Sequence, residues 1–309
     1  SLRSRSVASG GVSDVSDVSE ESDLYKPLKD NTRMTEVDLN AWIGRSQRID
    51  DAMDVGHAAR IAATLGGTAP KAGEPLPVLW HWCYFLESAP MAELGVDGHP
   101  ARGGFLPPAD NRNRMWAGSR VSIEGSLLAG VPAYKTTTIK SIVEKQGRTG
   151  SLLFVTLVHE VMQAGARVIY DEQDVVYRAP SPPKLEGTEP APTAAWRETV
   201  QPTSVWLYRY SAVTFNGHRI HYDFPYVTEQ EGYPGLVVHG PLTFTCMVQA
   251  FCRANPHARI KHLTHRGLRP LISPKPFDVA GNMVEDGLAH IWAEQDGTLA
   301  QQGEIRFEA

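Results

Sequence analysis

A proline-rich stretch near the middle of the chain most constrains its fold, because it separates two halves with a similar order of elements. Residues 179–202 contain prolines at positions 180, 182, 183, 190, 192 and 202, with alanine, serine and threonine between them. This composition predicts a semi-extended linker or a crossing loop. The 309 residues are enough for one large domain or for two of about 130 residues each.

Each half predicts a helix followed by strands. In the first half we expect an apolar helix over 78–94 and a Gly/Pro-rich loop over 98–108. Strands then follow over 115–124, 136–144, 151–162 and 167–178, with a hairpin at 163–167. In the second half we expect a helix over 241–253 and strands over 259–270, 288–294 and 304–308. The repeated order predicts two copies of one structural plan.

Alternation of apolar and polar residues carries the strand predictions. In 304–308, Ile305 and Phe307 point to one face and three charged residues to the other. Residues 151–158 are apolar on both faces, which is typical of a strand covered on each side.

The first 33 residues differ in composition from the rest of the chain. Residues 1–11 contain arginine and serine without an acid, and 13–23 form an acidic serine repeat. Neither part can bury apolar area, so we expect disorder. An organelle presequence and a plain linker both fit this composition. The predicted organisation is a tail over 1–33, a first half over 34–178, a linker over 179–202 and a second half over 203–309.

Charge and cysteine content exclude several classes of function. The net charge of −5 argues against nucleic acid as a partner, and no apolar run reaches the ~18 residues that a membrane span requires. Cys83, Cys246 and Cys252 are scattered, which suits a reducing compartment. No histidine spacing matches a metal motif, so we expect no metal site. His257, His262 and His265 lie near one another but on a strand-and-loop segment.

The segments 210–223 and 235–242 carry the chemistry that the sequence suggests. Asn216 and His221 lie five residues apart in a stretch too polar and irregular for a core. Gly240 and Pro241 follow at the mouth of the helix expected over 241–253, where the Gly240 N–H can point toward a ligand. An acid/base side chain beside free backbone N–H groups is what chemistry on a thioester requires. These residues predict an active site.

The same residues resemble the signature of R-specific enoyl-CoA hydratases and MaoC-like dehydratases of the hot-dog fold. In that pattern an Asp, an Asn-Pro-x-His and a later His-Gly occur at these spacings. His221 matches the family's His, His239 and Gly240 match its His-Gly, and Asn216 stands where Asp is usual. With the aromatic group 80–85, the form over residues 34–309 is most similar to two-domain members. These are the hydroxyacyl-thioester dehydratase type 2 and the mesaconyl- and itaconyl-CoA hydratases.

The resemblance implies an α+β double hot dog, in which two antiparallel sheets each wrap a long helix and pair edge to edge. It implies reversible hydration of a trans-2-enoyl thioester, with the second half catalytic and the first half shaping the substrate tunnel. His221 would be the acid/base, Asn216 would hold the water and Gly240 would bind the thioester carbonyl. An amide cannot share proton transfer as Asp can. A serine that often supports that Asp is replaced by Val248 here.

The resemblance also implies the partners. The substrate would be an acyl-CoA or an acyl carrier protein thioester, with coenzyme A or pantetheine as part of the substrate and no separate cofactor. The acyl group stays open between a long chain and a short dicarboxylic acid such as mesaconate. We expect a homo-oligomer through sheet edges, in the mitochondrial matrix if the source is eukaryotic and otherwise in the cytoplasm.

Two alternative functions remain at the level of sequence. The protein could be an acyl-CoA thioesterase, although Asp223, Glu229 and Glu231 match that arrangement poorly, or an acyl-thioester binding protein without catalysis. Trp80, Trp82, Tyr84 and Phe85 could pack in the core or line an acyl pocket. Asp223, Tyr222 and Tyr233 are expected to make local loop contacts.

Overall fold

The computed structural model describes residues 38–101, 103–109, 112–147 and 150–308. The chain divides into two units, Ser1–Asp38 and Leu39–Ala309, and the fold below is that of the second unit. The tail predicted over residues 1–33 lies outside the described residues.

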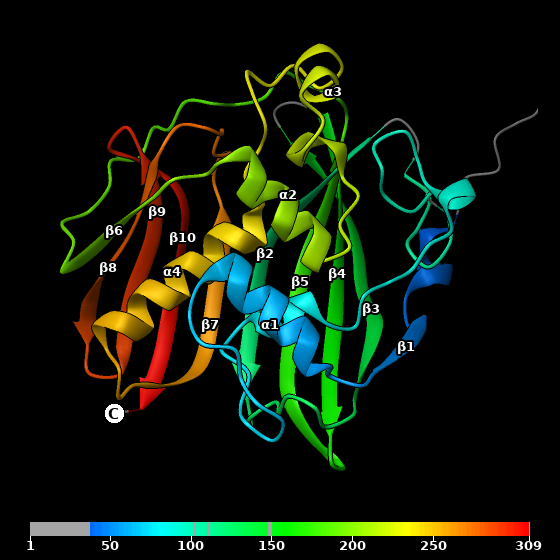
Figure 1. Cartoon of the computed structure of the whole chain (residues 1–309). Helices are drawn as coiled ribbons and strands as arrows, with labels where there is room; N and C mark the ends of the chain where they lie inside the picture. Colours follow the sequence, from blue (N-terminus) through cyan, green and yellow to red (C-terminus); the bar gives the residue numbers. More distant parts are fainter. Residues whose placement is uncertain (1–37, 102, 110–111, 148–149, 309) are drawn as a thin grey trace, which may run out of the picture. The chain divides into compact units, whose positions relative to one another are not determined.

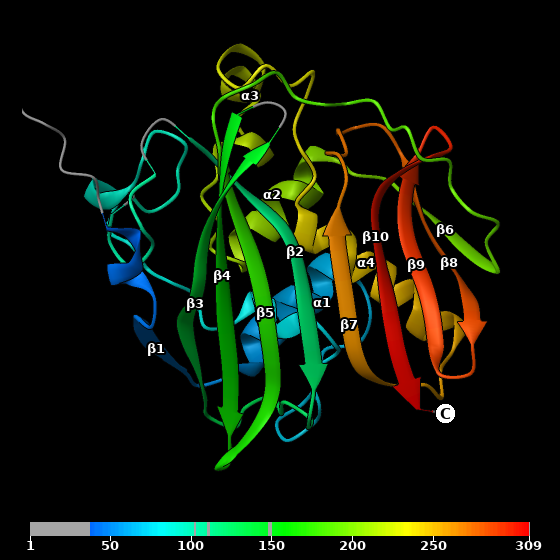
Figure 2. The same cartoon turned by 180° about the vertical axis from the view of Figure 1, so that it is seen from behind.

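One antiparallel sheet of ten strands forms the frame of this unit (Figures 1 and 2). Its order is β1-β3-β4-β5-β2-β7-β10-β9-β8-β6, so the first five strands of the sequence make one side and the last five make the other. The first-half strands are β1 Ser46–Asp51, β2 Asn113–Ile123, β3 Ala133–Gly147, β4 Gly150–Gln163 and β5 Ala166–Arg178. The second-half strands are β6 Trp196–Val200, β7 Arg259–Gly267, β8 Phe277–Glu285, β9 Leu288–Gln295 and β10 Thr298–Glu308.

The two halves meet where β2 pairs with β7. The pairing is antiparallel and runs from Gly118 opposite Arg266 to Ser122 opposite His262. It gives each half a neighbour for a strand that would otherwise be an open edge, leaving β1 and β6 as the edges of the joined sheet. The predicted α+β class with edge-to-edge pairing of two antiparallel sheets is confirmed.

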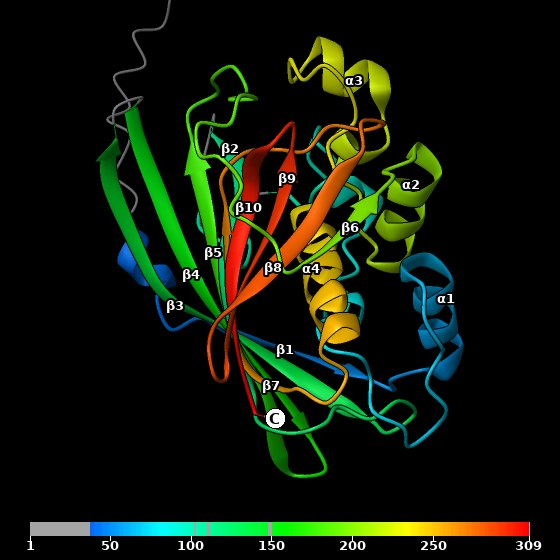
Figure 3. The ribbon, with the colours of Figure 1, turned by 90° about the vertical axis from the view of Figure 1, so that its left-hand side faces the viewer.

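The helices cover one face of the sheet (Figure 3). They are α1 Val55–Leu65, α2 Ser204–Val213, α3 Phe224–Glu229 and α4 Gly240–Ala254, with 3₁₀ turns η1 Leu39–Trp42, η2 Trp80–Cys83, η3 Met91–Glu93 and η4 Arg219–His221. Helix α4 lies against β6, β8 and β9 and buries Leu242, Phe244, Met247 and Phe251 completely. None of the helices in the described ranges is long and apolar enough to span a membrane.

The prediction of a helix over 78–94 is wrong, and the helix of the first half is α1 instead. Asp54 caps α1 by accepting a hydrogen bond from the His57 N–H, and Gly66 ends it. The aromatic group at 80–85 instead forms the short turn η2, and Phe85 has a positive φ of 56° that no helix allows. The aromatic residues at 80–85 gave an apolar pattern that resembled a buried helix, because they all pack into the core.

The aromatic group packs in the core, which is the first of the two interpretations given in the sequence analysis. Trp80, Tyr84 and Phe85 are each at most 2% exposed. Trp82 also lies in this cluster, where its Nε1 donates to Asp171 Oδ2 at 2.8 Å. The group therefore ties η2 to the inner face of the sheet.

The proline-rich stretch is only partly a linker. Residues 179–195 form neither a helix nor a strand, apart from a bridge between Pro190 and Thr298. Trp196–Val200, however, is strand β6 and pairs with β8. The last part of the predicted linker therefore completes the second-half sheet.

Candidate active site

The loop that follows α2 carries two of the three predicted site residues. The Asn216 N–H donates to Ser211 O, and Asn216 Oδ1 accepts a hydrogen bond from the His218 N–H at 2.9 Å. Asparagine side chains stabilise tight turns in this way. The turn leads directly into η4, whose last residue is His221. The local sequence thus fixes the direction of the chain just before the predicted acid/base.

His221 is buried and held in one orientation. Its Nδ1 lies 2.7 Å from Val237 O. Because a carbonyl oxygen only accepts, Nδ1 must carry the proton and Nε2 keeps its lone pair. Burial lowers the pKa of His221 to about 4, with a smaller opposing effect from the Val237 hydrogen bond. The ring is therefore neutral at pH 7 and has one nitrogen that can accept a proton.

A ring stack joins His221 to the start of α4. The rings of His221 and His239 are 3.6 Å apart with an angle of 18° between their planes, and His239 Nε2 lies 2.8 Å from Ser211 Oγ. His239 is the residue that caps α4, so Gly240 is the first residue of the helix. The structure therefore brings His221 next to the helix N-terminus that contains Gly240.

A larger residue at position 240 would force a neighbouring side chain to shift. A Cβ there would lie 2.9 Å from Cε3 of Trp116 on β2. Proline follows at position 241, which removes one N–H from the first helical turn. The N–H groups of this first turn lie at the positive end of the helix dipole, which favours a partly negative oxygen.

Asn216 and His221 are not directly bonded. Among the described residues, no hydrogen bond joins their side chains; the link runs through His218, whose ring lies 5.3 Å from the His221 ring, edge to face. Since Oδ1 of Asn216 closes the turn, its amide NH₂ is the group left for a ligand.

The neighbouring loop residues have structural partners. Asp223 caps α3 by accepting from the Tyr226 N–H at 3.1 Å and pairs with Arg219 at 2.8 Å. Tyr222 donates its hydroxyl hydrogen to Gly217 O. The prediction of local loop contacts is confirmed for Asp223 and Tyr222.

A turn from the first half also reaches this loop, which the sequence did not indicate. The Arg219 N–H donates to Asp97 O at 2.9 Å, and Arg219 Nη1 donates to Val96 O at 3.0 Å. Gly98 and Gly217 pack backbone to backbone: a Cβ on Gly98 would lie 2.0 Å from Gly217 O. Only glycines allow such a close approach.

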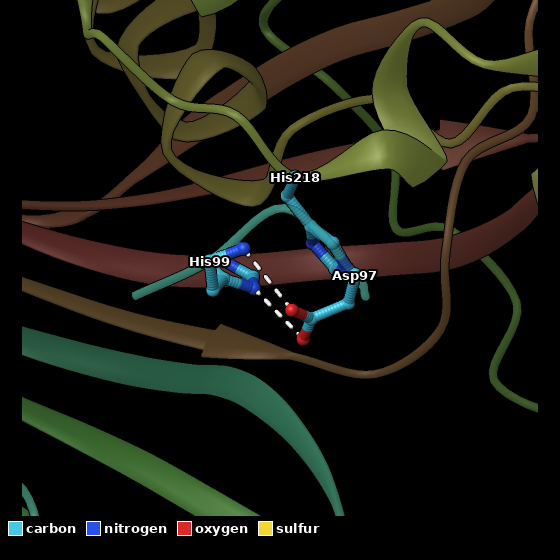
Figure 4. Close-up of side chains that lie close together, drawn as sticks. All are labelled: Asp97, His99 and His218. Carbon is cyan, nitrogen blue, oxygen red and sulfur yellow. Dashed lines mark hydrogen bonds and ion pairs between the residues drawn. The ribbon is translucent and has the colours of Figure 1, made fainter. Parts of the chain in front are cut away.

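This contact places Asp97 and His99 beside His218 (Figure 4). Asp97 Oδ2 lies 3.2 Å from His99 Nδ1, and the His99 ring lies 4.1 Å from the His218 ring. Burial alone would raise the pKa of Asp97, but the hydrogen bonds and charge of His99 outweigh it and hold that pKa below its usual range. Burial, with the nearby charge of His99, lowers the pKa of His218 well below its usual range.

These three side chains also have the composition of a metal site. One ligand atom from each of Asp97, His99 and His218 lies within 4.8 Å of the other two. Two imidazoles and a carboxylate suit zinc or another transition metal. Motif spacing could not have revealed this group, because the residues come from loops far apart in the sequence.

Two cavities lie away from these residues. One, of about 270 Å³, is lined by residues of β8, β9 and the turn that follows, with Arg197. The other, of about 230 Å³, lies between β1 and the start of α1 and includes Cys83 and Tyr84. Neither is lined by His221 or Gly240. The candidate site is therefore identified from its side chains and the α4 N-terminus, and not from either of these cavities.

Comparison with known proteins gives consistent matches. Residues 79–273 match a protein-family model described as hydroxyacyl-thioester dehydratase type 2. The chain is 43% identical over 254 residues to mesaconyl-C(4)-CoA hydratase of Chloroflexus aurantiacus, covering 79% of this chain and 89% of that protein. It is 35% identical over 99 residues to the mitochondrial hydroxyacyl-thioester dehydratase type 2 of Schizosaccharomyces pombe, covering 31% and 32% of the two chains.

A solved structure shows the same fold. The MaoC-like dehydratase of Phytophthora capsici superposes with a TM-score of 0.66 at 13% identity, covering 87% of this chain and 97% of that one. At this identity the match concerns the fold alone. It agrees with the double hot-dog arrangement of the ten-stranded sheet.

Proposed function

The chain belongs to the hydroxyacyl-thioester dehydratase type 2 family, and from that premise we propose how its residues carry out the family's reaction. It is a hydro-lyase that reversibly hydrates an enoyl thioester to a hydroxyacyl thioester. Water adds at C3 of a trans-2-enoyl group, and a proton adds at C2.

His221 is the principal acid/base in this proposal. The observation that supports the role is its Nδ1 contact to Val237 O, which leaves Nε2 unprotonated and fixes the ring against His239 at the α4 N-terminus. Nε2 takes a proton from the water as the oxygen bonds to C3. A base that is already neutral at pH 7 needs no prior loss of a proton.

Gly240 and Asn216 assist at either end of the reacting group. The Gly240 N–H would bind the thioester carbonyl, because charge that develops on this oxygen is stabilised by a fixed donor at a helix start. The Asn216 NH₂ would hold the attacking water by donating to its oxygen. As an amide it orients the water without exchanging protons.

The acyl group is proposed from the relatives. The relative with 43% identity is named a mesaconyl-C(4)-CoA hydratase, so a short unsaturated dicarboxylic acyl-CoA is the first substrate to test. A longer acyl group on an acyl carrier protein is the second. The name of the fission yeast relative supports a mitochondrial location, and the edges β1 and β6 are where self-association through strands would occur.

One assay separates hydration from the alternatives. Mesaconyl-C4-CoA and crotonyl-CoA are incubated with the protein while enoyl absorbance and free thiol are both followed. Loss of absorbance without thiol release is the expected result. Thiol release would instead indicate a thioesterase, and binding of both compounds without either change would indicate a binding protein.

Substitution of His221 tests the site. His221→Ala should lower kcat by about 10³-fold or more, because the reaction loses its base. Asn216→Asp should keep measurable activity, since a carboxylate can also hold water. Both variants are first checked for an unchanged circular dichroism spectrum. Hydration by His221→Ala at a rate near that of the wild type would refute the assignment.

A further inference from the structure

Asp97, His99 and His218 are three potential metal ligands that meet where the two halves touch. Asp97 and His99 lie in the turn that follows η3, and His218 lies in the loop after α2. One ligand atom of each side chain lies within 4.8 Å of those of the other two. Among the described residues, no other three histidines, cysteines or carboxylates come this close together. The group therefore stands apart from the other polar side chains of this structure.

The distances between these side chains suit the coordination of one ion. A tetrahedral zinc ion holds its ligands about 2.0–2.1 Å away, so neighbouring ligand atoms lie roughly 3.3 Å apart. Asp97 Oδ2 lies 3.2 Å from His99 Nδ1, close to that separation. The centres of the His99 and His218 rings are 4.1 Å apart (Figure 4). Rotation of the His218 side chain can shorten the remaining distances, which are at most 4.8 Å.

The backbone fixes the two segments relative to each other. Gly98 packs on Gly217, where a Cβ on Gly98 would lie 2.0 Å from the Gly217 carbonyl oxygen. The Arg219 N–H donates to Asp97 O at 2.9 Å. The two glycines are sequence neighbours of the three potential ligands, so these contacts set the ligand positions directly. A site whose ligands are already in place loses little conformational freedom when it binds an ion.

The Asp97 carboxylate is arranged as a metal ligand is. Its Oδ1 accepts a hydrogen bond from the His99 N–H at 3.0 Å, and ligating carboxylates are commonly held by such a bond. The Arg219 guanidinium on the opposite loop pairs with Asp223 and donates to Val96 O instead. Among the described residues, Asp97 forms an ion pair with His99 but with no lysine or arginine. A metal cation would supply the balancing charge.

The His218 ring offers nitrogens that the protein does not use. The ring lies against those of His99 and His221, with centres 4.1 and 5.3 Å away. Within the described ranges, neither ring nitrogen of His218 forms a hydrogen bond. Because imidazole nitrogens are the commonest metal ligands in proteins, a half-buried ring beside a carboxylate is suited to this role.

The chemistry of the three ligands selects the metal. Two imidazoles and a carboxylate suit zinc, whereas magnesium and calcium prefer oxygen ligands. The side chains of His99 and Asp97 are 20% and 22% exposed, so an ion can enter from solution. Three protein ligands leave the fourth position of a zinc ion to water.

We propose that Asp97, His99 and His218 form a zinc site that joins the first half of the chain to the second. The ion ties the turn after η3 to the loop that leads to His221, and its binding stabilises the folded chain. The sequence raised the opposite expectation, because motif spacing detects ligands that are close together in the chain. This site goes beyond the proposed reaction and does not depend on it.

The zinc content of the purified protein tests the proposal. The full chain without an affinity tag is saturated with zinc, dialysed against metal-free buffer and measured by mass spectrometry of the metal. We expect about one zinc ion per chain. His99→Ala and His218→Ala remove one ligand from each half, and each should weaken zinc binding by ~100-fold or more.

Thermal unfolding of the wild type gives a second measurement that needs no variant. A chelator should lower the thermal midpoint, and added zinc should restore it, because the ion binds the folded state alone. In His99→Ala and His218→Ala the midpoint should no longer respond to zinc. Circular dichroism shows beforehand whether each variant is folded.

His290 provides the matched control. It also pairs with a carboxylate, Glu304, at 3.1 Å, and its side chain is 50% exposed. No third ligand from the described residues completes a metal group there. His290→Ala should therefore bind zinc as tightly as the wild type and show the same response of the thermal midpoint.

Two results would overturn the proposal. Equal zinc binding by the wild type, His99→Ala and His218→Ala would indicate an adventitious ion only. A wild type that retains no zinc and whose midpoint ignores zinc would show that the three side chains only contact one another. Neither measurement requires an active enzyme, so failure of the proposed function in the enoyl-CoA assay is a separate outcome.

Discussion

At the scale of single residues, several histidines are neutral because they are buried. Burial lowers the pKa values of His221 and His265 to about 4 and holds that of His239 well below its usual range. His265 stacks on Trp116 at 4.3 Å and bonds to Gln301. In the unfolded chain these rings titrate near their ordinary pKa of about 6.5. The unfolded state therefore binds more protons at mildly acidic pH.

The resulting prediction concerns stability between pH 6.5 and 4. Each depressed histidine contributes stability above its unfolded pKa that is lost as the pH falls toward its folded pKa. His265 alone should lower the free energy of unfolding by up to about 2 kcal/mol between pH 7 and pH 5. Urea unfolding at the two pH values measures the change.

A substitution isolates this effect. In His265→Gln the free energy of unfolding should fall less between pH 7 and pH 5 than in the wild type, whatever its value at pH 7. His290→Gln, at an exposed position, should show the same loss as the wild type. An equal loss in all three proteins would contradict the prediction.

At the scale of elements, the contact between β2 and β7 depends on a glycine. A Cβ on Gly118 would lie 2.5 Å from the carbonyl oxygen of His265 on the paired strand. Backbone atoms of a central strand cannot move away as a flexible side chain can. The observed pairing of β2 with β7 therefore requires a residue without a side chain at position 118.

Gly118→Val should destabilise the protein by about 1–3 kcal/mol, because the new side chain forces the paired strands β2 and β7 apart. Gly104→Val is the matched control, since nothing lies within 4 Å of a Cβ at Gly104. Urea midpoints compare the two variants with the wild type. If the two substitutions lower the stability equally, β2 and β7 do not pair as closely as the structure shows.

At the scale of the whole molecule, the core is shared between the halves. The largest buried cluster joins Val121, Val161 and Ile169 of the first half to Phe244 and Ile305 of the second. Residues from both halves thus remove one another's apolar surface from water. The sheet adds to this sharing, because β2 has its pairing partners β5 and β7 in different halves.

We therefore expect that neither half folds alone. A fragment of residues 39–178 would expose the β2 edge and lose the second-half part of the core. Far-UV circular dichroism and thermal unfolding of this fragment should show no cooperative transition, whereas residues 39–309 should unfold in a single one. A cooperative transition for the isolated fragment would show that the halves are independent domains.

The strand predictions succeeded where alternation was clear. The predicted strands at 115–124, 151–162, 167–178 and 288–294 match β2, β4, β5 and β9 to within a few residues, and the helix at 241–253 matches α4. Strands β1, β6 and β8 and helices α1, α2 and α3 were not predicted from the sequence. Residues 78–94 were assigned wrongly because packing, not periodicity, fixed the backbone there.

The sequence by itself determined the family, the paired sheets and the segment that carries Asn216, His221 and Gly240, because motif spacing and alternation are local properties of the chain. Only the tertiary structure decided which nitrogen of His221 is bonded, that His239 stacks on it, and that Asp97 and His99 lie beside His218. The last of these contacts joins residues more than a hundred positions apart, and a close approach of two glycine backbones makes it. No local pattern encodes such an approach, since it exists only when both halves are folded against each other.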